Sequence, residues 1–193
     1  MKNICVFCGS SKGANSAYSE AARQMGLALV RRRIGLVYGG GNIGLMGVIA
    51  DTVLESGGEV IGVIPCALEE KEVAHAGLTK LHVVGSMHER KALMAELSDG
   101  FISLPGGFGT FEEFCEVITW SQLGIHAKPC GLLNVEGYYD ALINLFDTGV
   151  EERFIRPEHR RIVLVDTNPE RLLDQMRDFR APQVGKWLDL DRA

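Results

Sequence analysis

The 193-residue sequence lacks long hydrophobic runs and an excess of positive charge. No stretch approaches the roughly 18 apolar residues of a membrane-spanning helix, and the short apolar run after Met1 is too brief for a signal peptide. The net charge of -5 provides no general attraction to nucleic acid. We therefore expect a cytoplasmic protein that binds neither nucleic acid nor a membrane.

Signs of a disulfide framework, a metal site or a second domain are also missing. The five cysteines are odd in number, and Cys5 and Cys8 lie on one apolar run, where a strand would turn them to opposite faces. The five histidines are scattered, without the spacing of metal ligands. Linkers, low-complexity tracts and internal repeats are absent. We predict a single domain over residues 1–180, a C-terminal tail over residues 181–193, and no metal.

What the sequence contains is short apolar runs alternating with segments of helical period. The runs are NICVFCG, IGLVYGG, EVIGVIP, KLHVVG, GFISLPGG, PCGLLN and RIVLVD. Between them apolar residues recur at intervals of three and four, as at Leu45, Ile49 and Val53. Apolar strands that alternate with helices indicate a parallel sheet covered on both faces. We predict a Rossmann-like, doubly wound α/β fold with a mostly parallel sheet of about seven strands.

Three of the predicted strands run into glycine-rich turns: CGSSKG at 8–13, GGGNIGLMG at 39–47 and PGGFGT at 105–110. In doubly wound sheets the ligand lies beyond the carboxyl ends of the strands, so these turns are candidate binding sites. The middle turn has the spacing of a dinucleotide fingerprint at Gly39, Gly41 and Gly44, but it follows the second strand, and no acidic residue ends the next one. We favour binding of a phosphate, or close approach of another group to the backbone, over binding of NAD. The structural alternative is that the glycines only allow the turn to pack tightly.

The first turn contains the letters of a nucleophile elbow at Gly9, Ser11 and Gly13, without a properly placed Asp and His downstream. The third turn is more informative, because its glycines free backbone N–H groups at the positive end of the following helix, where a phosphate fits. Thr110 to Glu113 also read as a capping box, in which Glu113 merely accepts a hydrogen bond from a helix N-terminal N–H. Both interpretations of Glu113 are open at this point.

Arg90 and Lys91 stand early in a predicted helix, within SMHERKALMAEL. Two cations there oppose the helix dipole, unless they meet an anion. We interpret the pair as facing the substrate, with a solvated turn as the alternative.

The motifs GGGNIGLMG, MHERK and PGGFGTFEE, in this order, resemble those of the Lonely Guy family of cytokinin-activating phosphoribohydrolases. The last motif fits the family pattern PGGxGTxxE without a departure, and the likeness runs over residues 4–179. Enzymes of this family hydrolyse the N-glycosidic bond of N6-modified adenosine 5'-monophosphates, and some accept AMP. The resemblance implies a nucleotide-binding hydrolase domain over residues 1–180, a nucleoside 5'-monophosphate as the small-molecule partner, no cofactor, and a homodimer.

Carried over position by position, the resemblance assigns Arg90 and Glu113 as the catalytic pair. The substrate-binding residues that it implies are Glu72, Met87, Lys91, Gly106, Gly107, Phe108, Gly109, Thr110, Phe111, Glu112 and Thr119. Further candidates in the other two turns are Gly9, Ser10, Gly40, Gly41 and Gly44.

Two other functions are weighed against the hydrolase. The first is a non-catalytic nucleotide or cofactor carrier, because the fold also serves binding proteins. Retention of both Arg90 and Glu113 argues against it. The second is lysine decarboxylation, a label attached to related sequences. The chain is short for a pyridoxal-phosphate decarboxylase, and no lysine stands out as the Schiff-base residue.

Overall fold

The computed structural model describes residues 1–69 and 74–182, and in them all seven predicted strands form one sheet. Its order is β4-β3-β2-β1-β5-β6-β7, and every neighbouring pair is parallel. The strands are β1 (Asn3–Phe7), β2 (Gly35–Tyr38), β3 (Val60–Pro65), β4 (Lys80–Val84), β5 (Phe101–Ser103), β6 (Cys130–Leu133) and β7 (Val163–Asp166). The predicted Rossmann-like α/β fold is confirmed.

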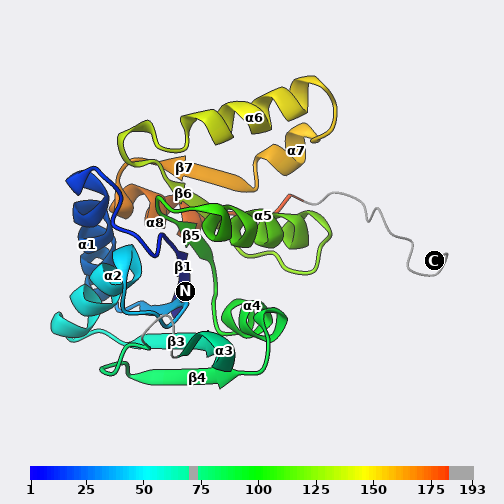
Figure 1. Ribbon diagram of the computed structural model, residues 1–193. Coiled ribbons are helices and arrows are strands. Elements are labelled where there is room, and N and C mark those ends of the chain that lie inside the picture. Colours follow the sequence, from blue (N-terminus) through cyan, green and yellow to red (C-terminus); the bar gives the residue numbers. More distant parts are fainter. Residues whose placement is uncertain (70–73, 183–193) are drawn as a thin grey trace.

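Helices cover both faces of the sheet (Figure 1). They are α1 (Ser16–Arg31), α2 (Gly44–Glu55), α3 (Cys66–Glu69), α4 (Met87–Glu96), α5 (Phe108–Gln122), α6 (Asp140–Glu151), α7 (Pro157–Arg160) and α8 (Pro169–Asp178), with a 3-10 turn η1 at Val135–Gly137. Helices α1, α2 and α8 pack on one face, and α4, α5 and α6 pack on the other. The sheet is therefore doubly wound.

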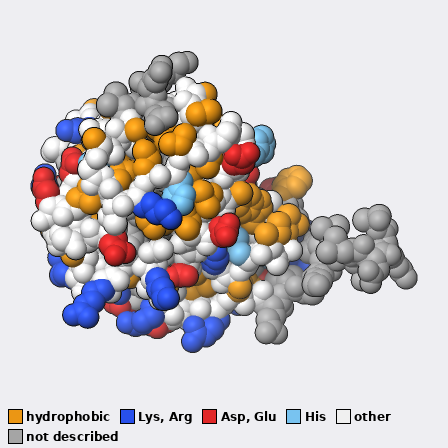
Figure 2. Space-filling view, turned by 90° about the horizontal axis from the view of Figure 1, so that it is seen from below, with side chains coloured by type: hydrophobic (Ala, Val, Ile, Leu, Met, Phe, Trp, Pro, Cys, Tyr) orange, Lys and Arg blue, Asp and Glu red, His pale blue; other side chains and the backbone are white. Residues whose placement is uncertain are grey.

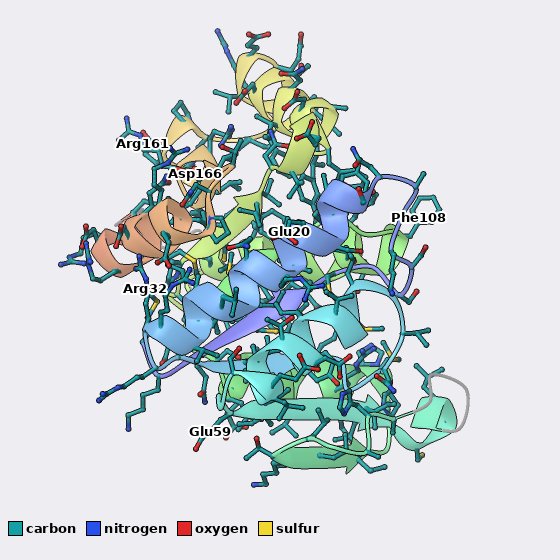
Figure 3. The ribbon with its side chains drawn as sticks, turned by 90° about the vertical axis from the view of Figure 1, so that its left-hand side faces the viewer. Glu20, Arg32, Glu59, Phe108, Arg161 and Asp166 are labelled. Carbon is teal, nitrogen blue, oxygen red and sulfur yellow. The ribbon has the colours of Figure 1, made fainter. Side chains whose placement is uncertain are left out.

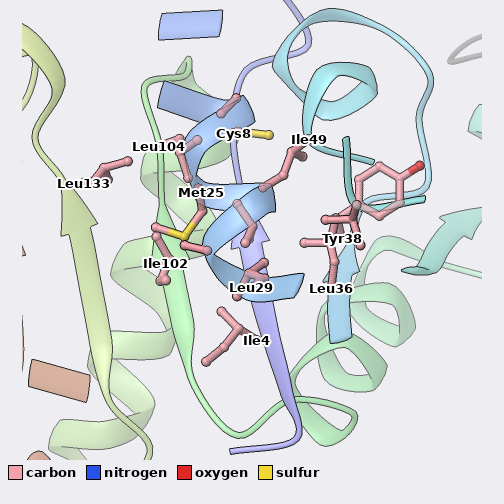
Figure 4. Close-up of a cluster of buried hydrophobic side chains, with 14 of the residues drawn as sticks. Ile4, Cys8, Met25, Leu29, Leu36, Tyr38, Ile49, Ile102, Leu104 and Leu133 are labelled. Carbon is pink, nitrogen blue, oxygen red and sulfur yellow. The ribbon is translucent and has the colours of Figure 1, made fainter. Parts of the chain in front are cut away.

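Each face of the sheet has its own hydrophobic core, because successive residues of a strand point to opposite sides. Met25 and Leu29 of α1 lie over Ile4, Ile102 and neighbouring strand residues in the first core (Figure 4). Cys5 belongs to the second core and Cys8 to the first, as their spacing predicts. Burial of this kind contributes roughly 1.5–3 kcal/mol for each large apolar side chain.

The sheet order places a topological switch point between β1 and β5. From β1 the chain adds β2, β3 and β4 on one side, and it then returns to place β5 on the other side of β1. The loops after β1 and β5 therefore leave the sheet beside each other, and the Gly9 N–H donates a hydrogen bond to the Pro105 carbonyl at 3.0 Å. Ligands of doubly wound proteins bind at such a point.

Across residues 1–69 and 74–182, no helix combines the length and the apolar character needed to cross a membrane. Residues 183–193 lie outside the described part of the chain. The predicted domain boundary at residue 180 and the tail therefore stay predictions.

Candidate active site

Helix α5 begins at Phe108, whereas a capping box over Thr110 to Glu113 would make Thr110 the N-cap. Its N-cap is Gly107, with φ -98° and ψ -157°, and no side chain caps the helix. The capping-box interpretation is therefore wrong: Thr110 is the third residue of the helix, and Glu113 lies in its second turn, too far along to cap it. The first N–H groups of a helix have no acceptor within it. They remain available to a ligand such as a phosphate.

The glycines of this turn differ in the space that surrounds them: Gly106 is tightly packed, whereas Gly107 and Gly109 are open. A Cβ on Gly106 would lie 2.1 Å from Thr110 Oγ1 and 2.9 Å from the backbone nitrogen of Gly9, so a side chain would push the two loops apart. At Gly107 and Gly109 a Cβ would have no protein atom within 4 Å. These two glycines flank Phe108, whose side chain is 91% exposed. Figure 3 shows Phe108 at the edge of the molecule.

A cavity of about 230 Å³ lies against the start of α5. It is lined by Cys8, Gly9, Ser10, Met46, Arg90, Gly107, Phe108, Gly109, Thr110 and Glu113. The structure thus brings the predicted catalytic pair together with the helix N-terminus and the first glycine turn. Sequence reasoning missed Cys8 and Met46, although each stands in or beside a glycine-rich turn that was singled out.

Arg90 is held rigidly in the wall of this cavity, although its α4 position suggested a solvated turn as an alternative. The residue is 6% exposed. Its Nε donates a hydrogen bond to the Val63 carbonyl at 3.1 Å, and its Nη2 donates to the Gly39 carbonyl at 3.2 Å. A Cβ on Gly39 would lie 2.0 Å from Nη2, so the guanidinium requires glycine there. The solvated-turn alternative is wrong.

The charges of Glu113 and Arg90 both act on the end of β1. Burial and then the charge of Glu113 raise the pKa of the Cys8 thiol. Burial and Glu113 also raise the pKa of Cys5, while Arg90 acts in the opposite direction. The raised pKa keeps the Cys8 thiol protonated, and the thiolate is the nucleophilic form of cysteine. Cys8 is therefore an uncharged, unreactive part of the cavity wall. Of the described residues that line this cavity, Glu113 alone has an acidic side chain.

Lys91 connects α4 with α5. Its Nζ donates to a carboxylate oxygen of Glu112 at 2.6 Å and to one of Glu116 at 2.9 Å. Burial disfavours the ammonium, but these hydrogen bonds outweigh it and raise the pKa of Lys91. A Schiff-base lysine needs the opposite shift. Lys91 holds the helix that carries Arg90 against the helix that carries Glu113.

The other predicted binding residues that the structure describes do not line this cavity, apart from those at the start of α5. Phe111 packs against Tyr138 and Tyr139, with ring centroids 6.4 Å and 6.3 Å away. Met87 is exposed, with its Sδ 3.8 Å from Arg90 Nη1. Thr119 donates from Oγ1 to the Cys115 carbonyl at 2.7 Å, well along α5. Glu72 lies outside the described residues.

In the second glycine turn, Gly40, Gly41 and Gly44 approach other backbone rather than lining this cavity. Gly44 has φ +62°, and a Cβ there would lie 2.2 Å from the carbonyl carbon of Ser10. Gly40 has φ +80°, and its carbonyl accepts a hydrogen bond from the His75 N–H at 3.1 Å. A neighbouring cavity of about 270 Å³ shares Gly9, Ser10 and Gly107 and extends to Tyr18, Leu45 and Tyr138.

Comparison with known proteins fits this geometry. The family model described as "Possible lysine decarboxylase" matches residues 46–176. One cytokinin riboside 5'-monophosphate phosphoribohydrolase of Arabidopsis thaliana is 52% identical over 99% of this chain and 90% of its own length. A second from the same plant is 52% identical over 92% of this chain and 84% of its own length. The chain belongs to the cytokinin riboside 5'-monophosphate phosphoribohydrolase family.

Among solved structures, the molybdenum cofactor carrier protein of Chlamydomonas reinhardtii has the same fold as this phosphoribohydrolase family member. The TM-score is 0.67 at 19% identity, over 92% of this chain and 98% of that one. A molybdenum cofactor binding protein of Rippkaea orientalis gives the same TM-score and identity, over 92% and 97% of the two chains. These two proteins thus share the fold of this chain.

Proposed function

We propose that this protein hydrolyses the N-glycosidic bond of N6-modified adenosine 5'-monophosphates, releasing the free base and ribose 5-phosphate. The observation that carries the proposal is the cavity at the switch point, where Arg90 and Glu113 meet the uncapped start of α5. The names of relatives that are 52% identical over nearly the whole chain support the same reaction. Lys91, which follows Arg90 in the chain, is engaged by two carboxylates, which disfavours it as the Schiff-base residue of a lysine decarboxylase.

In this proposal the 5'-phosphate binds at the start of α5. The backbone N–H groups of Phe108, Gly109 and Thr110 have no acceptor within the helix, and the helix dipole adds a favourable field for an anion. The open space at Gly107 and Gly109 lets phosphate oxygens approach that backbone. The sugar then extends over the next turn of α5, toward Glu113.

Glu113 acts on the sugar. As the bond between C1' and the base breaks, its electron pair leaves with the base, and positive charge grows on the ribose ring. A carboxylate stabilises that charge and orients the water that attacks C1'. The water delivers its hydroxyl to C1' and gives up one proton, and the departing base gains one, so that the free base and ribose 5-phosphate are both neutral at the broken bond. Arg90 cannot donate a proton, because a guanidinium stays charged. It holds Glu113 ionised and in position, or grips the substrate, with its own position fixed by Gly39 and Val63.

The first test is whether the 5'-phosphate dominates recognition. We expect release of base from AMP or an N6-modified AMP, and very little from the matching free nucleosides, because only the phosphate engages the α5 N-terminus. Chromatography of products from this paired panel measures it. Equal turnover of adenosine and AMP contradicts the phosphate assignment. Nucleotide binding without any base release favours a carrier instead.

We also propose that the protein is a homodimer whose interface includes Trp120 or Leu123. Leu123 and Ile125, at the end of α5, are 44% and 66% exposed. A second surface with clustered hydrophobic side chains contains β4 and α4 (Figure 2), and Val83 of β4 is 49% exposed. Val83 therefore serves as the control position. We expect light scattering at micromolar concentration to report a dimer, Leu123→Asp to shift it toward monomer, and Val83→Asp to leave it dimeric. A wild-type monomer, or dissociation by Val83→Asp alone, contradicts this interface.

A further inference from the structure

The segment after the undescribed residues 70–73 lies directly on the second glycine turn. Ala74 forms an isolated antiparallel bridge with Gly41. The next residue, His75, donates its backbone N–H to the Gly40 carbonyl at 3.1 Å. Gly40 and Gly41 are thus paired with residues that are more than thirty positions later in the chain.

The imidazole of His75 ties the same segment to helix α2. Its Nδ1 accepts a hydrogen bond from the Gly77 N–H at 3.1 Å, so the ring proton lies on Nε2. Nε2 is 2.8 Å from an oxygen of Asp51, to which it donates. The His75 side chain is 10% exposed, whereas that of Asp51 is 54% exposed. Helix α2 begins at Gly44, at the far end of the glycine turn. The contact between His75 and Asp51 therefore links the segment that pairs with Gly40 and Gly41 to the helix that follows the turn.

The second glycine turn contacts the guanidinium of Arg90 directly. Gly39 directly precedes Gly40, and its carbonyl accepts from Arg90 Nη2 at 3.2 Å. A Cβ at Gly39 would lie 2.0 Å from that nitrogen, so backbone and guanidinium are in tight contact. A displacement of the turn would therefore move one of the two carbonyls that orient the guanidinium, while the Val63 carbonyl on β3 stays in place.

We propose that His75, paired with Asp51, is a positioning residue for the hydrolysis: it holds the second glycine turn so that the Gly39 carbonyl orients Arg90 in the cavity. This inference rests on the proposed function. His75 itself contacts neither the cavity nor the start of α5, where the phosphate binds. Of the two roles proposed for Arg90, this inference takes the one that acts through Glu113, so loss of His75 should lower kcat and leave KM for the 5'-monophosphate nearly unchanged.

The test compares His75→Ala with His126→Ala. His126 is a matched control, because its Nδ1 also accepts an N–H from two residues ahead, that of Lys128 at 3.1 Å. Its Nε2 bonds to the Val117 carbonyl at 2.9 Å, and its ring packs on Phe101 at the other end of β5. At similar losses of thermal stability, we expect His75→Ala to lower kcat about tenfold and KM to change less than about twofold. His126→Ala should retain near wild-type kcat. Equal kcat in the two variants overturns the proposal.

Conservative variants separate positioning from general destabilisation. His75→Gln retains a donor that reaches Asp51 and should recover kcat to within about threefold of wild type. Asp51→Ala breaks the same bond from an exposed position and should repeat the kcat loss, even where His75→Ala fails to fold. A wild-type kcat in Asp51→Ala overturns the pairing.

A measurement on Arg90 itself is independent of turnover. The buried Arg90 Nε–H, bonded to the Val63 carbonyl, should give a side-chain NMR resonance that Arg90→Lys removes. We expect this resonance to shift in His75→Ala and to stay in place in His126→Ala. An unshifted resonance in His75→Ala overturns the inference, whether or not the wild-type protein releases a base. Absence of base release from wild type with the expected shift would overturn the proposed function alone.

Discussion

Glu113→Gln should be folded and should bind nucleotide, while its release of adenine or an N6-modified base falls at least about a hundredfold. Glutamine retains the size and hydrogen-bonding ability of the side chain but removes the charge that stabilises an oxocarbenium-like transition state. The phosphate site at the start of α5 is untouched by the change. Single-turnover product analysis and nucleotide titration measure the two effects separately.

Glu116→Gln is the matched control for that variant. It removes a charge from the same helix, where Glu116 faces Lys91 rather than the cavity. The contact between α4 and α5 is retained, because the glutamine oxygen still accepts from Lys91 and Glu112 also binds that lysine. We expect activity within about threefold of wild type. Arg90→Ala should also lose activity, and the Glu113→Gln/Arg90→Ala double variant should lose less than the product of the two single losses, because the two charges act as a unit. Wild-type base release by Glu113→Gln would falsify the catalytic assignment.

Gly106→Ala should lower activity about a hundredfold, because its Cβ would lie 2.1 Å from Thr110 Oγ1 and force the start of α5 to move. The same overpacking should lower the free energy of unfolding by about 1–3 kcal/mol. Gly109→Ala should behave differently, since a Cβ there has no protein neighbour within 4 Å and alanine favours a helix. Its stability should be equal or higher, while KM for AMP rises at least about tenfold, because the methyl group occupies the space of the phosphate.

Thermal unfolding and steady-state kinetics on the two alanine variants separate these expectations. We expect Gly106→Ala to lose stability, and Gly109→Ala to show a higher KM without a loss of stability. An unchanged KM in Gly109→Ala would mean that the phosphate lies elsewhere. Unchanged stability in Gly106→Ala would mean that the loops have room to separate.

The strands were predictable because each reads as a short apolar run, and the inner strands of the sheet are largely buried on both faces. The start of α5 was not, because its N-cap is glycine, which has no side chain to identify it, and because Thr110 and Glu113 imitate a capping box. The short α3 and α7 were not predicted either, since four residues are too few to display a period.

The site was predictable in its composition and less so in its contacts. Arg90 and Glu113 could be placed at one edge of the sheet, because the ends of parallel strands meet there. That Arg90 would be buried depends on carbonyls 27 and 51 positions away in the chain, which local patterns do not reveal. The engagement of Lys91 by α5 likewise depends on how two helices pack.

The uncapped start of α5 and Glu113 belong to one rigid element. From Phe108 to Glu113 the axis advances by about 7.5 Å at the usual rise of a helix. The proposed phosphate site and the Glu113 carboxylate therefore keep a constant separation, however the surrounding loops move. The helix fixes the distance that the substrate must span between them. A phosphorylated sugar that is one atom longer or shorter brings a different carbon opposite the carboxylate. On the binding mode that we propose, selection for a ribose 5-phosphate unit is thus a matter of length, set by the helix rise, before any contact with the base is made.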